Sequence, residues 1–233
     1  MGVIDYWKRE WNNVATTNAV TDDSCVLGQE KTTTPQTGIF YFNAKGELIK
    51  QEKSDERKNY LCLPVEGDLN NTYYVTLPNR DAMRKMRQIG REMSEYEKGI
   101  IIATDGSCSP KTVIGSRTGI AKNQWDEQLD CLLKKGKRIA YFIHSHPVCN
   151  LGNNPNPVTV GSKEPSDIDV NTQFYEDKVG AIIYWTNEFN KPLGGFSRNK
   201  EDYRAHVSFY AEKTGLLLSD FFLGDFEKLF GRL

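Results

Sequence analysis

The run Arg138-Ile-Ala-Tyr-Phe-Ile-His-Ser-His-Pro147 is the feature that most restricts the fold of this chain. Its apolar residues predict a buried β-strand, and that strand ends in two histidines one residue apart, His144 and His146. Side chains alternate between the two faces of a strand, so both imidazoles project from the same face. They present two neutral nitrogen donors to one point, which is half of a zinc site.

A carboxylate that could complete the site follows in Glu164-Pro-Ser-Asp-Ile-Asp169. Ser166 is a favourable residue with which to begin a helix, and Asp169 would then lie in the first turn. Ser-x-x-Asp is also a common helix-capping pattern, so by itself it identifies no ligand. Combined with His144 and His146, however, it predicts a metalloenzyme.

Composition narrows the class of protein. A chain of 233 residues, 38% of them hydrophobic, can form one large domain or one domain with an appendage. The formal net charge of -1 gives no general attraction to nucleic acid, and neither a membrane span nor a signal peptide is indicated. Five dispersed cysteines favour reduced thiols over a disulfide scaffold, and Cys149, three residues beyond His146, is favoured as a loop thiol rather than a ligand.

The hydrophobic pattern predicts an α/β (α+β) fold in which a mixed β-sheet is flanked by helices. Three segments are expected. Residues 1–77 would form an N-terminal extension, with a helix at Ile4, Trp7 and Trp11 and a hairpin over 38–51, and could link the chain to a larger parent. Residues 78–199 would form the core, and residues 200–233 a helical tail.

Within the core the expected order is helix, strand, strand, helix, strand, helix, strand. The tail places Leu218, Phe222, Phe226 and Leu229 at helical spacing, which predicts a helix that docks on the core or forms a self-association surface. His206 has no partner motif and is expected on a helix surface. The further expected strands lie at 60–63, 72–77, 95–103, 112–114, 179–185 and 193–197.

His144-Ser-His-Pro147 followed by Ser166-Asp-Ile-Asp169 resembles the JAMM motif of the JAB/MPN metalloprotease family. The resemblance covers about residues 80 to 197. It implies a cytidine-deaminase-like core and a zinc-dependent peptidase or isopeptidase, with Zn²⁺ held by His144, His146, Asp169 and a water. Members of the family cleave ubiquitin or ubiquitin-like adducts, sulfur-carrier fusions or other peptide bonds.

The resemblance also implies a glutamate that acts as general base. In the family it usually lies three residues before a glycine, a place taken here by Tyr96 between Glu95 and Glu97. Glu97 is favoured because it is nearest to Gly99 and the apolar run, and Glu95 is the alternative. A further alternative is that both glutamates are solvated carboxylates without a functional role. Ser166, or a nearby backbone N–H, would donate a hydrogen bond to the oxyanion.

This chain differs from the family pattern by the nineteen residues, 147–165, that separate the second histidine from Ser166. The enlarged loop could select substrate or act as a lid, or it could be a passive excursion. Together with the N-terminal extension, it favours the bacterial toxin or effector type of the family. That type implies a protein or peptide substrate and a neutralising immunity protein, in a soluble chain that is cytoplasmic or delivered as part of a secreted effector. The alternative is an interaction scaffold, metal-binding or metal-free, without catalysis.

Overall fold

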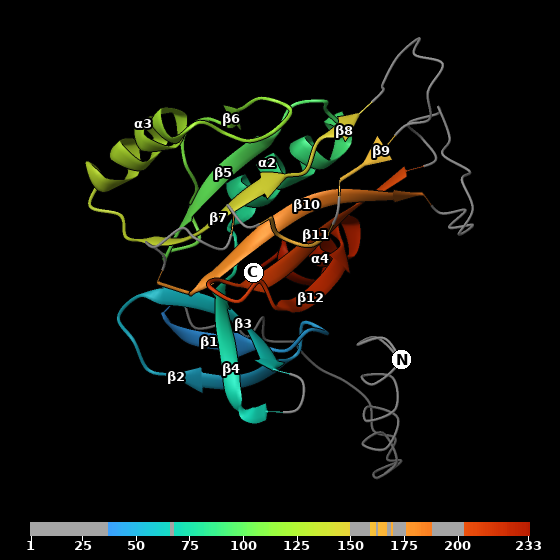
Figure 1. Cartoon of the computed structure of the whole chain (residues 1–233). Helices are drawn as coiled ribbons and strands as arrows, with labels where there is room; N and C mark the ends of the chain where they lie inside the picture. Colours follow the sequence, from blue (N-terminus) through green and yellow to red (C-terminus); the bar gives the residue numbers. More distant parts are fainter. Residues whose placement is uncertain are drawn as a thin grey trace, which may run out of the picture.

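The computed structural model describes residues 37–65, 68–149, 159–161, 163–166, 169, 176–187 and 203–233. In this part the chain forms an α+β fold with two mixed β-sheets, a short hairpin and three α-helices (Figure 1). The predicted fold class, a mixed sheet flanked by helices, is therefore confirmed. The helix predicted at the N-terminus and the strand predicted at 193–197 lie outside the described residues.

The larger sheet has six strands in the order β12-β11-β10-β7-β5-β6. Strands β7 and β10 run parallel, and every other neighbouring pair in this sheet is antiparallel. The strands are β5 (Lys98–Ala103), β6 (Val113–Ile114), β7 (Ile139–Ser145), β10 (Val179–Asn187), β11 (Tyr203–Ala211) and β12 (Leu217–Phe222).

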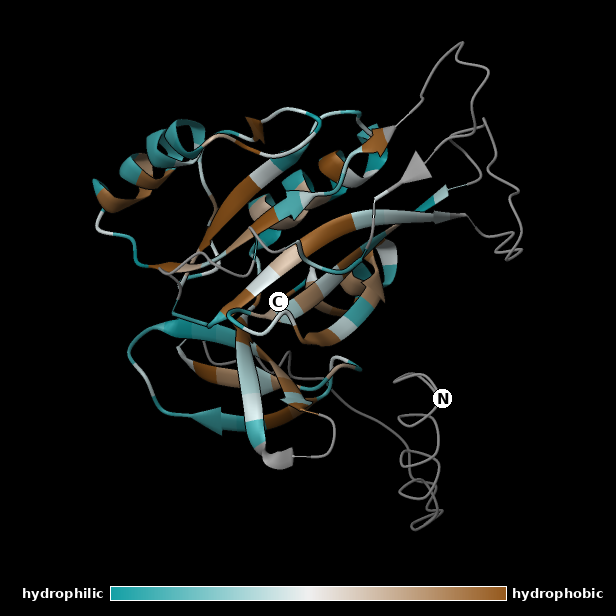
Figure 2. Cartoon of the chain, in the orientation of Figure 1, coloured by the Kyte–Doolittle hydropathy of each residue, from teal (hydrophilic) through white to brown (hydrophobic). Residues whose placement is uncertain are grey.

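Helices cover both faces of this sheet. α2 (Arg80–Glu92) and α4 (Leu223–Phe230) pack on one face, and α3 (Lys122–Leu133) packs on the other. In β5, Ile100 and Ile102 join the core under α2 and α4, whereas Ile101 packs in a separate cluster with Trp125 of α3. A strand buried on both faces needs no polar side, which explains the unbroken apolar run in the sequence and the hydrophobic colour of the central strands in Figure 2.

The first helix of the core, α2, is capped by Asn79. The side chain of Asn79 accepts hydrogen bonds from the backbone N–H of Asp81, at 3.1 Å, and of Ala82, at 3.0 Å. It thereby satisfies two of the amides that a helix start leaves without an intrahelical partner. Met83 and Met86, one helical turn apart on α2, are buried.

The smaller sheet has the order β2-β1-β3-β4 and confirms the predicted hairpin, because β1 and β2 pair antiparallel. Phe40 and Phe42 alternate with more exposed residues along β1 and join the same core as the large sheet. Thr76 ties the sheets together, since its N–H donates to Asp177 at 2.6 Å and its carbonyl accepts from Tyr141 at 3.0 Å. The strands are β1 (Gly38–Phe42), β2 (Leu48–Glu52), β3 (Arg57–Val65) and β4 (Asp68–Thr76).

The C-terminal segment differs from its prediction as a helical tail. Residues 203–222 form β11 and β12, which extend the large sheet, and only α4 is helical. Leu218 and Phe222, expected on a helix, therefore lie on a strand, whereas Phe226 and Phe230 are buried on α4. His206 is not on a helix surface but on β11, where it is 9% exposed. A spacing of four residues puts Leu218 and Phe222 on one face of a helix and equally on one face of a strand, so the spacing could not separate the two.

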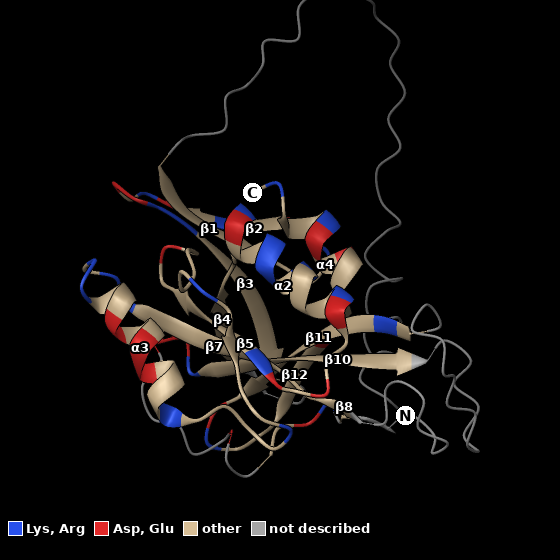
Figure 3. Ribbon diagram, turned by 90° about the horizontal axis from the view of Figure 1, so that it is seen from above, with Lys and Arg blue, Asp and Glu red and all other residues tan. Residues whose placement is uncertain are grey.

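Charged residues lie mainly on the outward surfaces of the helices and in the connections, as Figure 3 shows for α3 and α4. In the described part of the chain, no helix has both the length and the apolar character needed to cross a bilayer.

Candidate metal centre

Strand β7 positions the two histidines. Its apolar residues pair with β5 on one side and β10 on the other, so the strand end is held by backbone hydrogen bonds. His144 lies opposite Gly99 of β5 and Ile182 of β10, and His146 N donates to the carbonyl of Ile183 at 3.0 Å. The alternation along β7 places both imidazoles on the face that α3 covers, with ring centroids 5.2 Å apart.

Asp169 reaches the same point from a separate turn. Its N–H donates to the carbonyl of Ser166 at 3.0 Å, which closes the turn. In return, the N–H and the hydroxyl of Ser166 both donate to Asp169 Oδ2 at 2.7 Å. The predicted relation between these residues is therefore present, and the Ser166 hydroxyl orients the carboxylate. The neighbouring positions of the predicted helix, 167, 168 and 170–175, lie outside the described residues.

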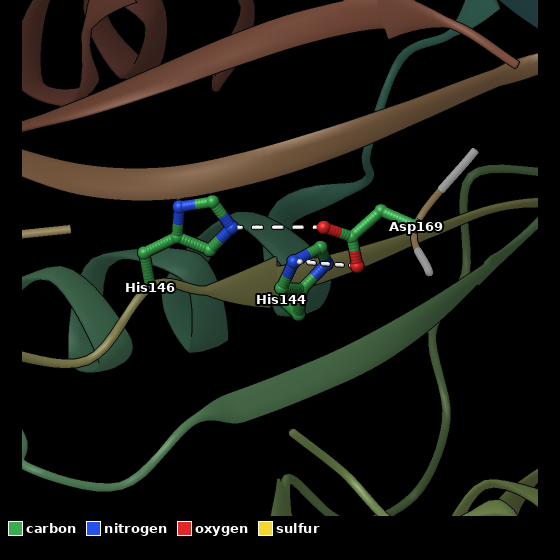
Figure 4. A group of neighbouring side chains, drawn as sticks. All are labelled: His144, His146 and Asp169. Atoms are coloured by element: carbon green, nitrogen blue, oxygen red, sulfur yellow. Dashed lines mark ion pairs between the residues drawn. The ribbon is translucent and has the colours of Figure 1, made fainter. Parts of the chain in front are cut away.

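The structure brings the three predicted ligands together, as Figure 4 shows. His144 Nε2 lies 3.3 Å from Asp169 Oδ1, and His146 Nε2 lies 3.8 Å from Asp169 Oδ2. One ligand atom from each of the three residues lies within 4.8 Å of the others. Ligand bonds of about 2.0–2.2 Å in a tetrahedral zinc site put donor atoms roughly 3.4 Å apart, so the observed spacing is close to what Zn²⁺ needs.

A buried nitrogen supports a metal at this point. His144 Nε2 is buried and, in the described part of the chain, has no hydrogen-bond partner of good geometry, although a carboxylate oxygen is 3.3 Å away. An unsatisfied buried polar atom is costly, and metal coordination would satisfy it. Two imidazoles and one carboxylate suit a catalytic zinc site, which has three protein ligands and an open fourth position.

The electrostatics favour an ionised Asp169. Burial alone would raise the pKa of this carboxyl, but the nearby imidazoles of His144 and His146, aided by the hydrogen bond from Ser166, lower its pKa well below its usual range. Asp169 is therefore a carboxylate at neutral pH, the form that binds a cation.

Of the two candidate glutamates, Glu97 interacts electrostatically with the ligands. It directly precedes β5, and two backbone hydrogen bonds fix its backbone, from Glu97 N to the Ser116 carbonyl at 2.9 Å and from Gly115 N to the Glu97 carbonyl at 2.8 Å. The pKa of Glu97 is raised, chiefly by burial; the charges of His144 and His146 lower it, and the charge of Asp169 raises it. The Glu97 carboxylate is therefore within electrostatic range of all three ligands.

Glu95 is directed elsewhere. Its Oε2 forms an ion pair with Arg117 Nη2 from the connection between β6 and α3. Both glutamates precede β5; Glu95 pairs with Arg117, and the charge of Glu97 interacts with the three ligands.

Two residues that the sequence analysis did not single out shape the site. The hydroxyl of Ser145, between the two histidines, accepts the N–H of Lys98 at 3.0 Å and so fixes the residue that follows Glu97. Gly99 gives α3 room to approach the sheet, because a Cβ at this position would lie 2.2 Å from Trp125 Cη2. The position of Ser145 between the two histidines could have indicated a role at the site. The contact of Gly99 with Trp125 could not have been found from the sequence around Gly99.

The enlarged loop returns to the site through a short hairpin. β8 (Val148–Cys149) pairs antiparallel with β9 (Thr159–Val160), and the chain then places Gly161 so close to His146 that a Cβ there would lie 2.3 Å from the histidine Cβ. The carbonyl of Lys163 accepts the hydroxyl of Ser208 at 3.0 Å, which ties the returning chain to β11. The described part of the insertion is therefore anchored to the sheet beside a predicted ligand. The side chain of Cys149 and residues 150–158 lie outside the described part.

His206 belongs to a second polar group on the same sheet. Its Nε2 is 2.8 Å from Thr186 Oγ1, and its Nδ1 is 3.2 Å from Asp220 Oδ1, whose other oxygen accepts the Tyr184 hydroxyl. These contacts account for both ring nitrogens, so the third histidine of the chain does not join the metal centre.

Comparison with known proteins gives no match to any family model, any curated protein or any solved structure.

Proposed function

We propose that this chain is a metal-dependent hydrolase that cleaves peptide or isopeptide bonds, with Zn²⁺ held by His144, His146 and Asp169. The proposal is carried by the buried Nε2 of His144, which has no hydrogen-bond partner of good geometry among the described residues and faces the same point as the other two ligands. The electrostatic interaction of Glu97 with those ligands supports hydrolysis, because a carboxylate near the metal could move a proton between a water and the substrate.

Each residue would have a defined task. Bound Zn²⁺ would supply a Lewis acid that lowers the pKa of a coordinated water to about 7 and polarises the scissile carbonyl. Glu97 would take a proton from the water as its oxygen bonds to the carbonyl carbon, and would give that proton to the nitrogen when the C–N bond breaks. The single proton of the Ser166 hydroxyl is donated to Asp169. In the reaction this hydroxyl would either keep that bond and orient Asp169, with a nearby backbone N–H donating to the oxyanion, or turn to donate to the oxyanion itself.

The sequence resemblance supports a protein or peptide substrate, and adducts of ubiquitin-like proteins belong to this class. It also supports an effector or toxin domain in a bacterial secreted protein, with a neutralising partner in the producing cell.

The proposal is tested by metal analysis followed by hydrolysis. We expect about one zinc per chain in the wild type and little in Asp169→Ala. Wild type with zinc should cleave a peptide mixture or isopeptide-linked ubiquitin dimers, lose this activity to a chelator and regain it when zinc is added. Absence of any bound metal after zinc is supplied at neutral pH would overturn the metal centre. Stoichiometric metal without cleavage of either substrate would favour the scaffold alternative.

A further inference from the structure

The three candidate ligands lie on two parts of the chain that are held in different ways. His144 and His146 lie at the end of β7, which pairs with β5 and β10. Asp169 instead lies on the chain that returns from the insertion. The described residues of this returning chain, 159–161, 163–166 and 169, are called the arm below. Assembly of the metal centre therefore depends on how the arm is attached to the sheet.

The arm is first fixed where it begins. β9 pairs antiparallel with β8, with Val160 opposite Val148. Val148 is fully buried, and its N–H donates to the carbonyl of Ser94, just beyond α2, at 2.8 Å. Gly161 then lies against His146, where a Cβ would be 2.3 Å from the histidine Cβ. The arm thus passes so close to one ligand that a side chain larger than that of glycine would collide with it.

Ser208 of β11 provides a second point of attachment. It is fully buried, and its hydroxyl donates to the Lys163 carbonyl at 3.0 Å. Ser208 lies opposite Ile182 of β10, which lies opposite His144 of β7, so the three side chains form one row on the same face of the sheet. Neighbouring strands are about 4.8 Å apart, which places Ser208 about 10 Å from His144 across the sheet. The bond to Ser208 therefore holds the arm on the face from which both imidazoles project.

A short length of chain joins this attachment to the carboxylate ligand. Ser166 is three residues beyond Lys163, and its N–H and hydroxyl both donate to Asp169 Oδ2 at 2.7 Å. Asp169 Oδ1 in turn lies 3.3 Å from His144 Nε2. A ligand that is already held in place loses less conformational freedom when the metal binds. The attachment at Ser208 therefore favours metal binding.

We propose that Ser208 is a positioning residue of the metal centre, which acts through Asp169 by holding the arm on the sheet. The inference rests on the metal centre of the proposed function, but not on the bond that is cleaved. Without the Ser208 hydroxyl, the Lys163 carbonyl loses this donor and the arm leaves the sheet more often. Apparent metal affinity then falls in proportion to the fraction of molecules in which Asp169 is in place.

Zinc affinity of the full chain, measured by competition with a chromophoric chelator, tests the proposal. Ser208→Ala should weaken zinc binding about fivefold or more, because loss of one hydrogen bond changes an equilibrium by about this factor. Ser208→Thr keeps the hydroxyl and should restore wild-type affinity. Ser219→Ala, on the neighbouring strand β12, is the matched control, because the buried Ser219 hydroxyl has no hydrogen-bond partner in the described part of the chain. It should bind zinc like wild type.

Hydrogen exchange of the zinc-free protein provides a second measurement. The N–H groups of Ser166 and Asp169 both donate hydrogen bonds when the arm is in place, so they should exchange faster in Ser208→Ala than in wild type. The amides of β7 should exchange at the wild-type rate. Thermal melting confirms that each variant is folded, and a lower melting temperature alone would not change the zinc affinity of the folded chain.

The proposal is overturned if Ser208→Ala keeps wild-type zinc affinity, if its arm exchanges no faster than that of wild type, or if Ser219→Ala causes the same loss. A folded Ser208→Thr variant that binds zinc as weakly as Ser208→Ala would also overturn it. Absence of zinc from the wild type would overturn this proposal together with the proposed function. Zinc binding without cleavage of any substrate would overturn the proposed hydrolysis alone.

Discussion

At the scale of single residues, two neighbouring glutamates have different environments because they interact with residues distant in the chain. Glu95 and Glu97 are two residues apart and both precede β5, yet Glu95 pairs with Arg117, whereas the charge of Glu97 interacts with the three ligands. Sequence spacing alone could not separate them, because the position of Arg117 depends on how the connection from β6 to α3 is folded.

Replacing each glutamate by glutamine tests this difference. Glu97→Gln should lower kcat on the substrate that the wild type cleaves by about 10² to 10⁴-fold, because the amide cannot accept the proton, and should leave bound zinc unchanged. Glu95→Gln is the matched control and should keep nearly full activity. If Glu97→Gln retained wild-type kcat, Glu97 would not be the general base.

Ser166 offers a second test at this scale. Both its hydroxyl and its N–H donate to Asp169 Oδ2, so Ser166→Ala removes one of the two groups that orient the ligand. Loss of such an outer partner typically costs about 10–100-fold in metal affinity. A zinc titration against a chromophoric chelator should show this loss, with affinity restored in Ser166→Thr. The control Ser54→Ala, in the connection between β2 and β3, should keep wild-type affinity. Unchanged affinity in Ser166→Ala would show that the hydroxyl is dispensable.

At the scale of elements, the site depends on the packing of α3 against the start of β5, on one face of the sheet. Gly99 lies opposite His144, and the large ring of Trp125 occupies the space where its side chain would be. The Trp125 ring in turn makes an edge contact with Phe142 of β7, at a centroid distance of 4.9 Å. Helix and strand are thus fitted together at the residues that neighbour the ligands.

Gly99→Ala should therefore destabilise the protein. The added methyl group would lie 2.2 Å from Trp125 and 2.9 Å from the Ile143 carbonyl, so either α3 or the strand must move. Overpacking of this kind costs about 1–3 kcal/mol of unfolding free energy, which urea denaturation can measure. Gly224→Ala, on a helix with open space around the new methyl group, should be neutral or stabilising by up to about 1 kcal/mol. Equal stability of the two variants would contradict the tight contact.

At the scale of the whole molecule, the two sheets share a core and a buried junction. Asp177, next to the start of β10, accepts the N–H of Thr76 at the end of β4. Burial raises the pKa of Asp177 to about 6, even though the hydrogen bonds of Thr76 lower it. The junction therefore contains a carboxyl group that is disfavoured in its charged form.

This raised pKa predicts how stability depends on pH. Between the ordinary value of 3.8 and about 6 the folded state holds more protons at Asp177 than the unfolded state. The unfolding free energy should then fall as pH rises through this window and level off above it. Because of Asp177, the unfolding free energy of the wild type should fall by about 2 kcal/mol between pH 4.5 and 7. Asp177→Asn has no carboxyl group at this position and should not show this fall. In urea unfolding, the stability of the variant relative to wild type should therefore rise by about 2 kcal/mol over the same pH range. An equal pH dependence in both proteins would mean that Asp177 titrates normally.

Much of this molecule follows from local sequence. The α+β class, the hairpin over 38–51, the order of helix and strand in the first part of the core, and the strand that ends at His144 and His146 are predicted by apolar periodicity. The association of these histidines with Asp169 was also predicted, because the ligands form a recognisable order and two of them lie at the end of one strand. Local periodicity contains this information because neighbours along an element share its faces.

Tertiary structure decided the rest. It made strands of residues 203–211 and 217–222, paired Glu95 with Arg117, and placed His206 against Thr186 and Asp220. Each of these features depends on contacts between segments far apart in the chain. Such contacts depend on which faces of the elements pack together, and the spacing of residues within one segment does not determine this.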